Sequence, residues 1–312
     1  MKRINVEGSW PGLVTPFTEK DELNIECLKK LVQFHIENGS DGLLVMGSTG
    51  EAIMLSKEER LRVIDASVDV ANGKMPVMCG ISAVTTKDTI ENALSAKDAG
   101  ADCGLLVQPP YIVPTQEALY QYYKEVAESA DFPVVIYHNP TRTGVSLQAE
   151  TIAKLANLSN IIALKEAGPS PYQVIRVIEL TRGKFNVLCC DCPSYALILP
   201  TLAAGGKGTS NVTGSLVPRE FKELSRPWQT FKDAQKTREL YFKLLPLMRL
   251  MYAETNPVPL KAALNMVGAG VGRPRKPLTE LSEAHVPALK LTLKRLGILE
   301  ENSYQRKFFS KK

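Results

Sequence analysis

The chain has 312 residues, of which 44% are hydrophobic and 23% charged, and its formal net charge is +5. This composition is typical of a globular protein with a sizeable core, and the small basic excess argues against an extended nucleic-acid-binding surface. No apolar run approaches membrane-spanning length and no secretory signal pattern is visible, so we expect a cytoplasmic protein with no membrane partner.

Three of the six cysteines, Cys189, Cys190 and Cys192, cluster around Asp191. Such a string can ligate a metal ion, but no second Cys or His pair lies at the spacing of a zinc site. We therefore predict buried, reduced thiols at a strand end, and no metal.

Apolar, β-rich runs alternate with segments of helical apolar spacing along the first two thirds of the chain. The predicted strands are Gly12–Phe17, Gly42–Gly47, Met75–Ile81, Cys103–Gln108, Phe132–Asn139, Ile161–Glu166, Phe185–Cys190 and Gly208–Val212. The predicted helices between them include Asn24–Asn38, Ser56–Ala71, Thr86–Ala99 and Thr115–Ala130. A strand–helix repeat of about thirty residues favours an α/β fold, a (β/α)8 TIM barrel, over a doubly wound sheet.

Local signals support several of these boundaries. Ser56 and Glu59 form a Ser-x-x-Glu capping box, and Thr115 is a typical N-cap residue. The glycines expected to end helices are Gly39, Gly73, Gly100 and Gly183.

The pattern changes after about residue 217, where helical segments follow one another without strands. These segments are Phe231–Tyr252, Val258–Met266 and Ala284–Leu296. We predict a barrel core over residues 1–216 and a C-terminal helical region packed on it over residues 217–312. The region ends in a basic tail, interpreted as a solvated terminus, that contains Arg306, Lys307, Lys311 and Lys312.

Two predicted strands end in groups suited to carbonyl chemistry. Lys165 ends an apolar strand, where alternation places it on the same face as Ile161 and Ala163, and desolvation there favours the neutral amine that attacks a carbonyl. Tyr137 ends another strand and is expected in the same lumen, where a phenol can act as general acid and base. Active sites of TIM barrels lie at these strand ends.

Further polar groups follow the strand ends. Gly47-Ser48-Thr49 is suited to holding a carboxylate through hydroxyl and backbone N–H groups, and Arg142 offers a fork for a second carboxylate. Tyr111 follows another strand at the barrel mouth. Three of these features also have an ordinary structural interpretation: the Gly47-Ser48-Thr49 string as a turn, Arg142 as a surface ion pair, and Tyr137 as a core aromatic residue with a satisfied hydroxyl.

In sequence order and spacing, these motifs resemble the dihydrodipicolinate synthase and N-acetylneuraminate lyase superfamily. The residues that carry the resemblance are Gly47–Glu51, Tyr137 with Asn139-Pro140, Arg142-Thr143-Gly144 and Ile161–Glu166. The resemblance covers about Gly8 to Ile298. It implies a lyase that is a metal-free class I aldolase on a (β/α)8 barrel, usually a homotetramer built as a dimer of dimers, with no cofactor beyond the imine to Lys165.

The resemblance also implies roles for single residues. Lys165 matches the lysine that forms a Schiff base with pyruvate, and Tyr137 the general acid and base. Ser48 and Thr49 match the loop that binds the pyruvate carboxylate and relays protons, with Gly47 preceding it. The remaining matches are Tyr111, which reaches a neighbouring subunit's site, Arg142, which binds the second substrate's carboxylate, and Ser210, where a backbone carbonyl approaches the lysine.

Some positions depart from the family pattern. Val84 and Pro110 stand where lysine-inhibited synthases have Asn and Tyr, and Lys57 and Arg60 stand where histidines are common, so we expect insensitivity to lysine. His138 and the string Cys190-Asp191-Cys192 are also unusual, and are expected to alter the wall around the second substrate.

The aldehyde substrate stays open between alternatives. Tyr111 and the Arg142 context favour the synthase branch, which condenses pyruvate with L-aspartate 4-semialdehyde in lysine and diaminopimelate biosynthesis. The altered wall favours a related aldolase acting on a sugar acid, a 4-hydroxy-2-oxoglutarate or N-acetylneuraminate. A non-catalytic keto-acid-binding protein is a third possibility, opposed by the presence of both Lys165 and Tyr137.

Overall fold

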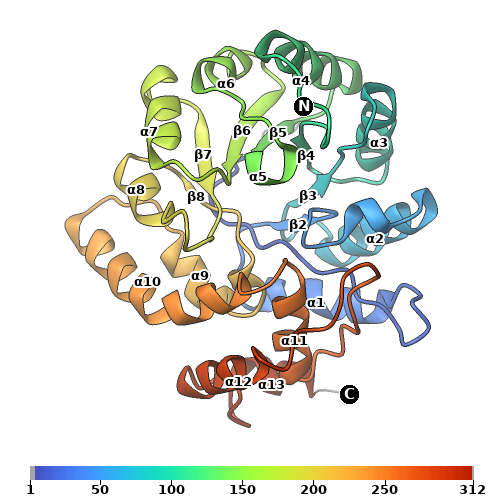
Figure 1. Ribbon diagram of the computed structural model, residues 1–312, viewed down its shortest axis with the longest axis vertical. Coiled ribbons are helices and arrows are strands. Elements are labelled where there is room, and N and C mark those ends of the chain that lie inside the picture. Colours follow the sequence, from blue (N-terminus) through green and yellow to red (C-terminus); the bar gives the residue numbers. More distant parts are fainter. Residues whose placement is uncertain (1–3, 311–312) are drawn as a thin grey trace.

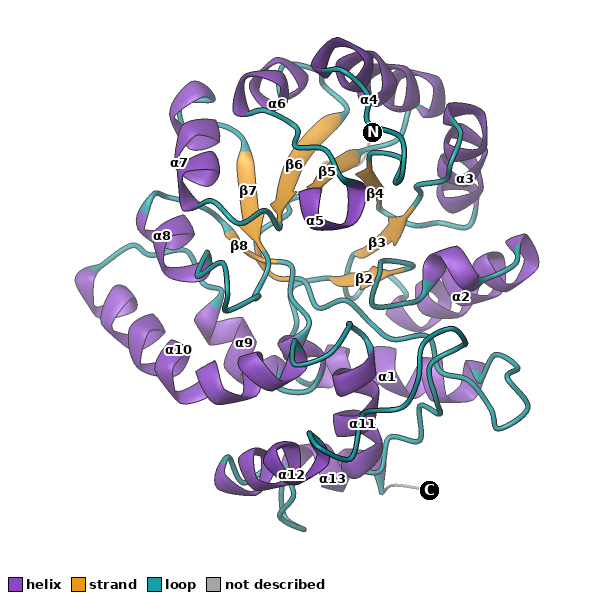
Figure 2. Ribbon diagram, in the orientation of Figure 1, coloured by secondary structure: helices purple, strands orange, loops and turns teal. Residues whose placement is uncertain are grey.

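Eight parallel strands form one curled sheet surrounded by helices in the computed structural model, which describes residues 4–310 (Figures 1 and 2). The order in the sheet is β1-β8-β7-β6-β5-β4-β3-β2. A parallel bridge between Gly12 and Leu44, with Leu13 N donating to Leu44 O at 2.9 Å, closes the ring. The strands are β1 (Gly8–Ser9), β2 (Leu43–Val45), β3 (Val77–Gly80), β4 (Cys103–Val107), β5 (Val134–His138), β6 (Ile161–Glu166), β7 (Asn186–Cys189) and β8 (Gly208–Thr209). The predicted (β/α)8 barrel is confirmed.

The first predicted strand, Gly12–Phe17, is wrong. The first strand lies earlier, at Gly8–Ser9, where it pairs with β8. Pro11 and Pro16 lack the N–H that continues a ladder, so beyond β1 the chain makes isolated bridges at Gly12 and Phe17 and single backbone hydrogen bonds, such as Gly12 N to Asn211 O at 2.8 Å. The last strand is also shorter than predicted, since it ends at Thr209 instead of Val212.

The longer helices that alternate with the strands form the outer layer, whereas the single-turn helix α5 (Pro140–Thr143) lies over the middle of the barrel (Figure 2). Both predicted caps are present: Ser56 and Glu59 make a full capping box, and the Thr115 side chain accepts from Ala118 N. The four predicted terminal glycines all have positive φ. The helices are α1 (Ile25–Glu37), α2 (Lys57–Ala71), α3 (Thr86–Asp98), α4 (Gln116–Ala130), α5 (Pro140–Thr143), α6 (Ala149–Leu155), α7 (Pro171–Leu180) and α8 (Ile198–Ala203), with short 3-10 helices at Ala52–Met54 and Thr213–Ser215.

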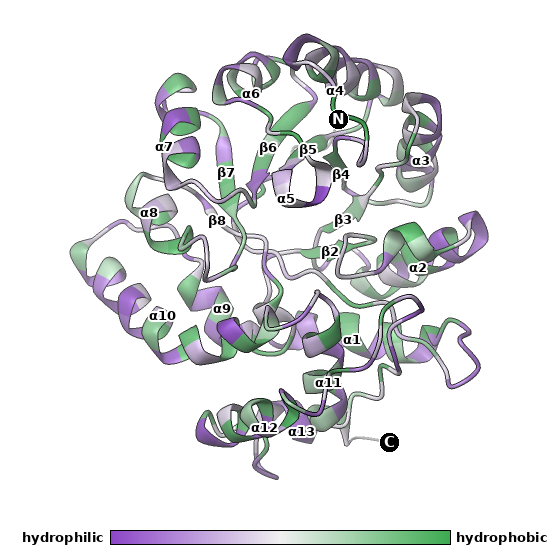
Figure 3. Cartoon of the chain, in the orientation of Figure 1, coloured by the Kyte–Doolittle hydropathy of each residue, from purple (hydrophilic) through white to green (hydrophobic). Residues whose placement is uncertain are grey.

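Two apolar clusters lie on the two sides of the sheet, whose strands are largely hydrophobic (Figure 3). The larger cluster fills the space between strands and helices. The smaller cluster fills the barrel interior and includes Val135, Tyr137 and Ala163. Burial on both faces explains the continuous apolar runs in the sequence.

From residue 217 to residue 310, the C-terminal region contains five helices: α9 (Pro218–Leu224), α10 (Phe231–Met251), α11 (Val258–Met266), α12 (Val286–Arg295) and α13 (Tyr304–Phe309). The three predicted helices correspond to α10, α11 and α12. Arg306 and Lys307 of the predicted basic tail lie exposed on α13, which packs on α1 through Phe309 and Phe34, 4.9 Å between ring centroids. Lys311 and Lys312 lie outside the described residues, and the division at residue 217 stays a prediction. Within residues 4–310, no helix is long and apolar enough to cross a membrane.

Candidate active site

Lys165 and Tyr137 meet in the barrel interior, at the C-terminal ends of β6 and β5. They occupy directly paired positions in the sheet, and Lys165 Nζ lies 4.7 Å from the centroid of the Tyr137 ring. Only 8% of Lys165 and 7% of Tyr137 is exposed. An amine and a phenol, both withdrawn from water and in contact, form a pair that can exchange a proton with a bound carbonyl compound.

The alternation predicted for β6 holds only in part. Ala163 points into the barrel and Leu164 toward the helices, as predicted. Ile161, predicted to face the barrel, packs in the outer cluster, and Ile162 packs against the inner one. The cause is a register shift: Val134 pairs with Ile161, but Val135 pairs with Ala163, so one extra residue reverses the alternation before Lys165.

The Tyr137 hydroxyl is oriented by a neighbouring amide. Asn139 Nδ2 donates to the phenol oxygen at 2.7 Å, and Thr141 Oγ1 in turn donates to Asn139 Oδ1 at 2.7 Å. Because the phenol oxygen accepts from Asn139, its own proton remains available for a group in the cavity.

Ser48 and Thr49 lie on a tight turn after β2. Gly50 N donates to Gly47 O and Glu51 N to Ser48 O, and Glu51 has a left-handed φ of 54°. Asn256 Nδ2 donates to Thr49 Oγ1 at 2.9 Å, which leaves the Thr49 proton free to bind an acceptor such as a carboxylate.

One cavity of about 260 Å³ joins these groups. Its wall contains Ser48, Thr49, Tyr137, Arg142, Lys165 and Ser210. Among the described residues, two buried polar atoms of this wall have no hydrogen-bond partner, Ser210 Oγ and Asn256 Oδ1. Buried polar atoms without a protein partner are expected where a ligand or water binds.

Of the residues that the structure describes, three charged ones line this cavity: Lys165, Arg142 and Glu254. Arg142 comes from α5, a single turn that was not predicted. Glu254 follows α10, and its Oε1 accepts from Ser282 and contacts His285 Nδ1 at 2.7 Å. These contacts, the hydrogen bond from Ser282 above all, hold the Glu254 pKa below its ordinary value, so the residue is an anion at neutral pH.

Two predicted site residues do not line this cavity. Gly47 lines a neighbouring cavity of about 300 Å³, which shares Ser48 and Tyr137 with the first and also contains Val84 and Pro110. Tyr111 lies on the loop after β4 with 98% of its surface exposed, so within this chain it contacts no part of the cavity.

The residues that depart from the family pattern do not all lie in the cavity wall. Cys190 and Cys192 line the cavity, as expected for a changed wall, and all six cysteines are free thiols. Burial raises the pKa of the Cys190 thiol well above its ordinary value, which keeps it protonated and unreactive. His138 lines neither cavity. The expectation that it alters the wall is wrong, because it points away from the barrel interior and contacts Glu166 at 2.7 Å.

Asp191 is a structural residue at this end of the barrel. Its two carboxylate oxygens accept from Val212 N and Thr213 N, and Tyr252 donates its hydroxyl at 2.6 Å. It therefore joins the end of β7 to the segment after β8 and to the end of α10. Among residues 4–310, no group of three or more His, Cys, Asp or Glu side chains is arranged to hold a metal ion.

Sequence reasoning missed Asn139, Glu254 and Asn256. The last two belong to the C-terminal region, which was interpreted as an extension packed on the barrel. The available signal was the string Glu254-Thr255-Asn256 directly before Pro257, because polar residues between a long helix and a proline-initiated helix lie at a helix end that can face a site.

Comparisons with known proteins agree on one family. A family model described as the dihydrodipicolinate synthetase family matches residues 5–296. The 4-hydroxy-tetrahydrodipicolinate synthase of Methanocaldococcus jannaschii is 42% identical over 94% of this chain and 99% of its own length. That of Methanopyrus kandleri is 40% identical over 96% and 99%. The crystal structure of the chloride-inhibited dihydrodipicolinate synthase from Acinetobacter baumannii, complexed with pyruvate, has a TM-score of 0.88 and 36% identity, and the match covers 94% of this chain and all of that one.

Proposed function

The chain belongs to the dihydrodipicolinate synthetase family, and from this membership we propose that it catalyses the 4-hydroxy-tetrahydrodipicolinate synthase reaction. In this reaction pyruvate and L-aspartate 4-semialdehyde condense through an imine to Lys165. The enzyme is a lyase of the metal-independent class I aldolase type. The observation that carries the proposal is the buried contact between Lys165 Nζ and the Tyr137 ring inside a cavity with room for small substrates.

The first half of the reaction uses Lys165 and Tyr137 directly. The neutral amine attacks the ketone carbon of pyruvate, and water leaves once a proton reaches the departing hydroxyl, which yields an imine. Tyr137 supplies and recovers protons, and the protonated imine draws electrons from the methyl group to give an enamine. Ser48 and Thr49 hold the pyruvate carboxylate, with Gly47 before them and the Ser210 segment opposite.

The second half needs a site for the semialdehyde. The enamine carbon attacks the aldehyde and forms the carbon–carbon bond, and the amino group of the former semialdehyde then displaces Lys165 from the imine and closes the ring. Arg142 binds the carboxylate of this substrate through its guanidinium fork. The Glu254 carboxylate supports an amino aldehyde, since it places a negative charge in the cavity wall where an ammonium group can bind.

The proposal is tested by trapping the imine. The protein is incubated with pyruvate and borohydride, and its intact mass and peptide map are compared with those of Lys165→Ala. We expect one pyruvate-sized adduct, confined to Lys165, and turnover when L-aspartate 4-semialdehyde is added. An adduct without that turnover would redirect the assignment to aldolases that act on sugar acids, and no adduct would refute the mechanism.

The charges of the cavity also bear on the runner-up, an aldolase for sugar acids, a 4-hydroxy-2-oxoglutarate or N-acetylneuraminate. The aldehydes that such enzymes release carry no ammonium group. Succinic semialdehyde differs from L-aspartate 4-semialdehyde only by the missing amino group, so it is the best alternative substrate for testing the role of this group. We expect a higher kcat/KM for L-aspartate 4-semialdehyde than for succinic semialdehyde. Glu254→Gln should reduce the ratio of these two values. Equal use of both aldehydes by the unaltered protein would favour the runner-up.

We infer further that the protein works as a homo-oligomer, with a dimer of dimers as the expected form. Apolar side chains are exposed around the second cavity and on the adjoining loop after Pro110, and an exposed patch of this kind is typical of an interface. The patch consists of Ile53, Val84, Tyr111, Ile112 and Val113, which are between 51% and 98% exposed. In this oligomer, we propose, Tyr111 enters a neighbouring copy's site and joins its proton relay; its 98% exposure in the single chain supports this role. The cytoplasmic location stays a prediction.

Subunit mixing tests the role of Tyr111. Lys165→Ala and Tyr111→Phe are each expected to be impaired, but a hybrid dimer contains one site with both Lys165 and a partner's tyrosine. Co-refolding the two variants should therefore restore activity beyond that of either one. A mixture no more active than its components, with hybrids verified by native mass spectrometry, would show that Tyr111 serves no neighbouring site.

A further inference from the structure

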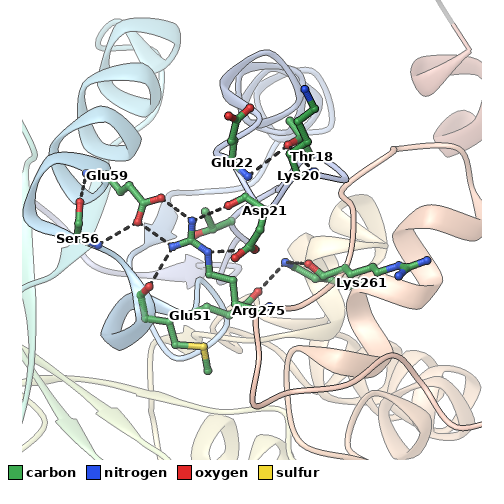
Figure 4. A network of polar contacts seen from close by, with 12 residues as sticks. Thr18, Lys20, Asp21, Glu22, Glu51, Ser56, Glu59, Lys261 and Arg275 are labelled. Carbon is green, nitrogen blue, oxygen red and sulfur yellow. Dashed lines mark hydrogen bonds and ion pairs between the residues drawn. The ribbon is translucent and has the colours of Figure 1, made fainter.

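The turn that presents Ser48 and Thr49 is held by a buried ion pair that the proposed reaction does not use. Glu51 ends this turn, and its side chain is fully buried. Lys261 of α11, which is 1% exposed, places Nζ 2.6 Å from Glu51 Oε1, and Arg275 N donates to Glu51 Oε2 at 2.7 Å (Figure 4). Both oxygens of this carboxylate are thus occupied by groups of the C-terminal region.

Lys261 is itself held from several sides. Its Nζ donates to Arg273 O at 3.0 Å and lies 4.3 Å from the centroid of the Phe17 ring. Burial lowers the Lys261 pKa, and the nearby Glu51 carboxylate opposes that shift. A buried lysine of this kind is costly to the fold unless it is paired, so removal of Glu51 would leave an uncompensated charge.

The same helix reaches the turn at a second point. Asn256 lies just before α11 and donates to Thr49 Oγ1, a contact between residues 207 positions apart in the chain. Asn256 and Lys261 therefore hold Thr49 and Glu51, two residues apart on one turn. The start of α11 fixes the turn at both places.

An outer set of contacts fixes the segment after α11. The Arg275 guanidinium contacts both oxygens of Glu59 and donates to Asp21 O at 2.9 Å (Figure 4). It lies 4.3 Å from the centroid of the Phe17 ring. The guanidinium also donates to Met54 O at 3.0 Å, three residues beyond Glu51, so it contacts the segment that follows the turn. The network thus has an inner part, Glu51 with Lys261, and an outer part, Arg275 with Glu59.

We propose that Glu51 and Lys261 are positioning residues for the hydroxyls that bind the pyruvate carboxylate. The inference rests on the proposed function, which assigns that carboxylate to Ser48 and Thr49. The ion pair sets the distance between α11 and the turn, and Asn256, just before the same helix, orients the Thr49 hydroxyl. The C-terminal region is accordingly part of substrate binding, and not only a cover of the barrel.

Two identical substitutions separate positioning from stability. In the unaltered protein, Lys261 Nζ and Arg275 N each contact one carboxylate oxygen of Glu51. Glu51→Gln keeps one of these oxygens as an acceptor and replaces the other by an NH₂ group, which faces a donor. Glu59→Gln makes the same chemical change in the outer part. We expect Glu51→Gln to raise the KM for pyruvate about tenfold or more with a smaller change in kcat, as lost ground-state binding does. Glu59→Gln should lower Tm and leave this KM within about twofold.

Further controls keep the result interpretable. If the unpaired Lys261 prevents folding of Glu51→Gln, the double variant Glu51→Gln/Lys261→Met removes both charges and carries the same expected KM. Lys236→Met breaks the exposed ion pair between Lys236 and Glu223 and should change neither Tm nor KM appreciably.

The inference is overturned if Glu51→Gln, or the double variant, lowers Tm but binds pyruvate with unchanged KM. The borohydride adduct distinguishes this failure from that of the proposed function. An unaltered protein that forms the adduct, beside a Glu51→Gln variant of normal pyruvate KM, refutes the positioning role alone. An unaltered protein that forms no adduct refutes the proposed function, and the positioning role with it.

Discussion

The strand half and the loop half of the candidate site are held in place by different kinds of contact. Lys165 and Tyr137 form the strand half, and the hydrogen-bonded register of β5 and β6 sets their separation. Ser48 and Thr49 form the loop half, and their turn depends on side chains from the C-terminal region. The groups proposed for covalent chemistry thus sit on the rigid sheet, whereas those proposed to hold the carboxylate sit on a turn supported from outside the barrel.

The support behind each half differs in the same way. Behind the strand half, the next paired residues, His138 and Glu166, contact each other at 2.7 Å, so support passes between neighbouring strands. Behind the loop half, Glu51 contacts Lys261 of α11, far away in sequence. A change in the C-terminal region should therefore affect binding of the carboxylate more than the chemistry at Lys165.

The largest effect is expected in the strand half. Tyr137→Phe removes the hydroxyl but keeps the ring that packs on Lys165. Because general acid–base catalysis contributes about 100- to 10,000-fold, kcat should fall by that order. Steady-state rates measure the loss of kcat. Imine trapping is run beside them, and the pyruvate adduct should still form, although more slowly. An unchanged kcat would exclude Tyr137 as the proton-transfer group.

The corresponding change in the loop half should act on binding. Thr49→Val keeps the shape of the side chain but loses the hydroxyl, and with it the contact to Asn256. A hydrogen bond to a charged group contributes about 1.5–3 kcal/mol, so the KM for pyruvate should rise about 10- to 100-fold. A variant that loses kcat at unchanged KM would contradict the division into two halves.

Much of the strand half could be predicted from sequence, because local patterns determine it. A strand that ends in Lys165 and one that ends in Tyr137 are visible as apolar runs, and the parallel fold brings their ends together. The error at Ile161 arose where the register shift beside Val134 adds a residue to one strand, which depends on the partner strand and has no signature in β6 itself.

The loop half could be predicted only as far as its own residues. Ser48 and Thr49 stand in a recognisable turn, but nothing near Lys261 in the sequence indicates that it is buried against Glu51. A lysine on a helix usually keeps its amine in water, and its partner is set by tertiary packing. The prediction of the first strand was wrong for the same reason, namely that tertiary packing decides it. Gly8–Ser9 is a strand because β8 lies beside it.

A change in the buried pair behind the strand half should reduce stability. Glu166 is fully buried and accepts from Gly168 N as well as contacting His138. Glu166→Leu removes both contacts and leaves the buried Gly168 N–H and His138 without their acceptor, so the free energy of unfolding should fall by about 1–3 kcal/mol for each unsatisfied group. Glu150→Leu, at an exposed ion pair with Arg176, is the matched control and should cost less than about 1 kcal/mol. If urea unfolding gave the same loss of free energy for Glu166→Leu and Glu150→Leu, the buried pair would contribute no more to stability than the exposed one.

Acid should weaken the outer contacts of the loop half by a smaller amount. The Arg275 guanidinium lowers the pKa of Glu59 below its ordinary value of 4.5. The folded state thus releases this proton more readily than the unfolded state, so the stabilisation is complete above pH 4.5 and is lost as the pH falls through the lowered pKa. Thermal unfolding of Glu59→Gln should therefore show a weaker pH dependence in this window than the unaltered protein. Parallel curves would mean that the contact is not linked to protonation.

The smallest expected effect is that of lysine, which should leave both halves unchanged. Val84 and Pro110, on which the expected insensitivity to lysine rests, line the second cavity beside Ser48 and Glu51, and neither side chain can donate a hydrogen bond to an amino acid there. The Arg60 guanidinium already donates to Ala52 O and Gly80 O. Because this cavity borders the turn of the loop half, lysine bound there would first be detected as a change in the KM for pyruvate. Initial rates at several pyruvate concentrations, with and without millimolar lysine, should coincide, and inhibition at sub-millimolar lysine would show that other residues of this cavity bind it.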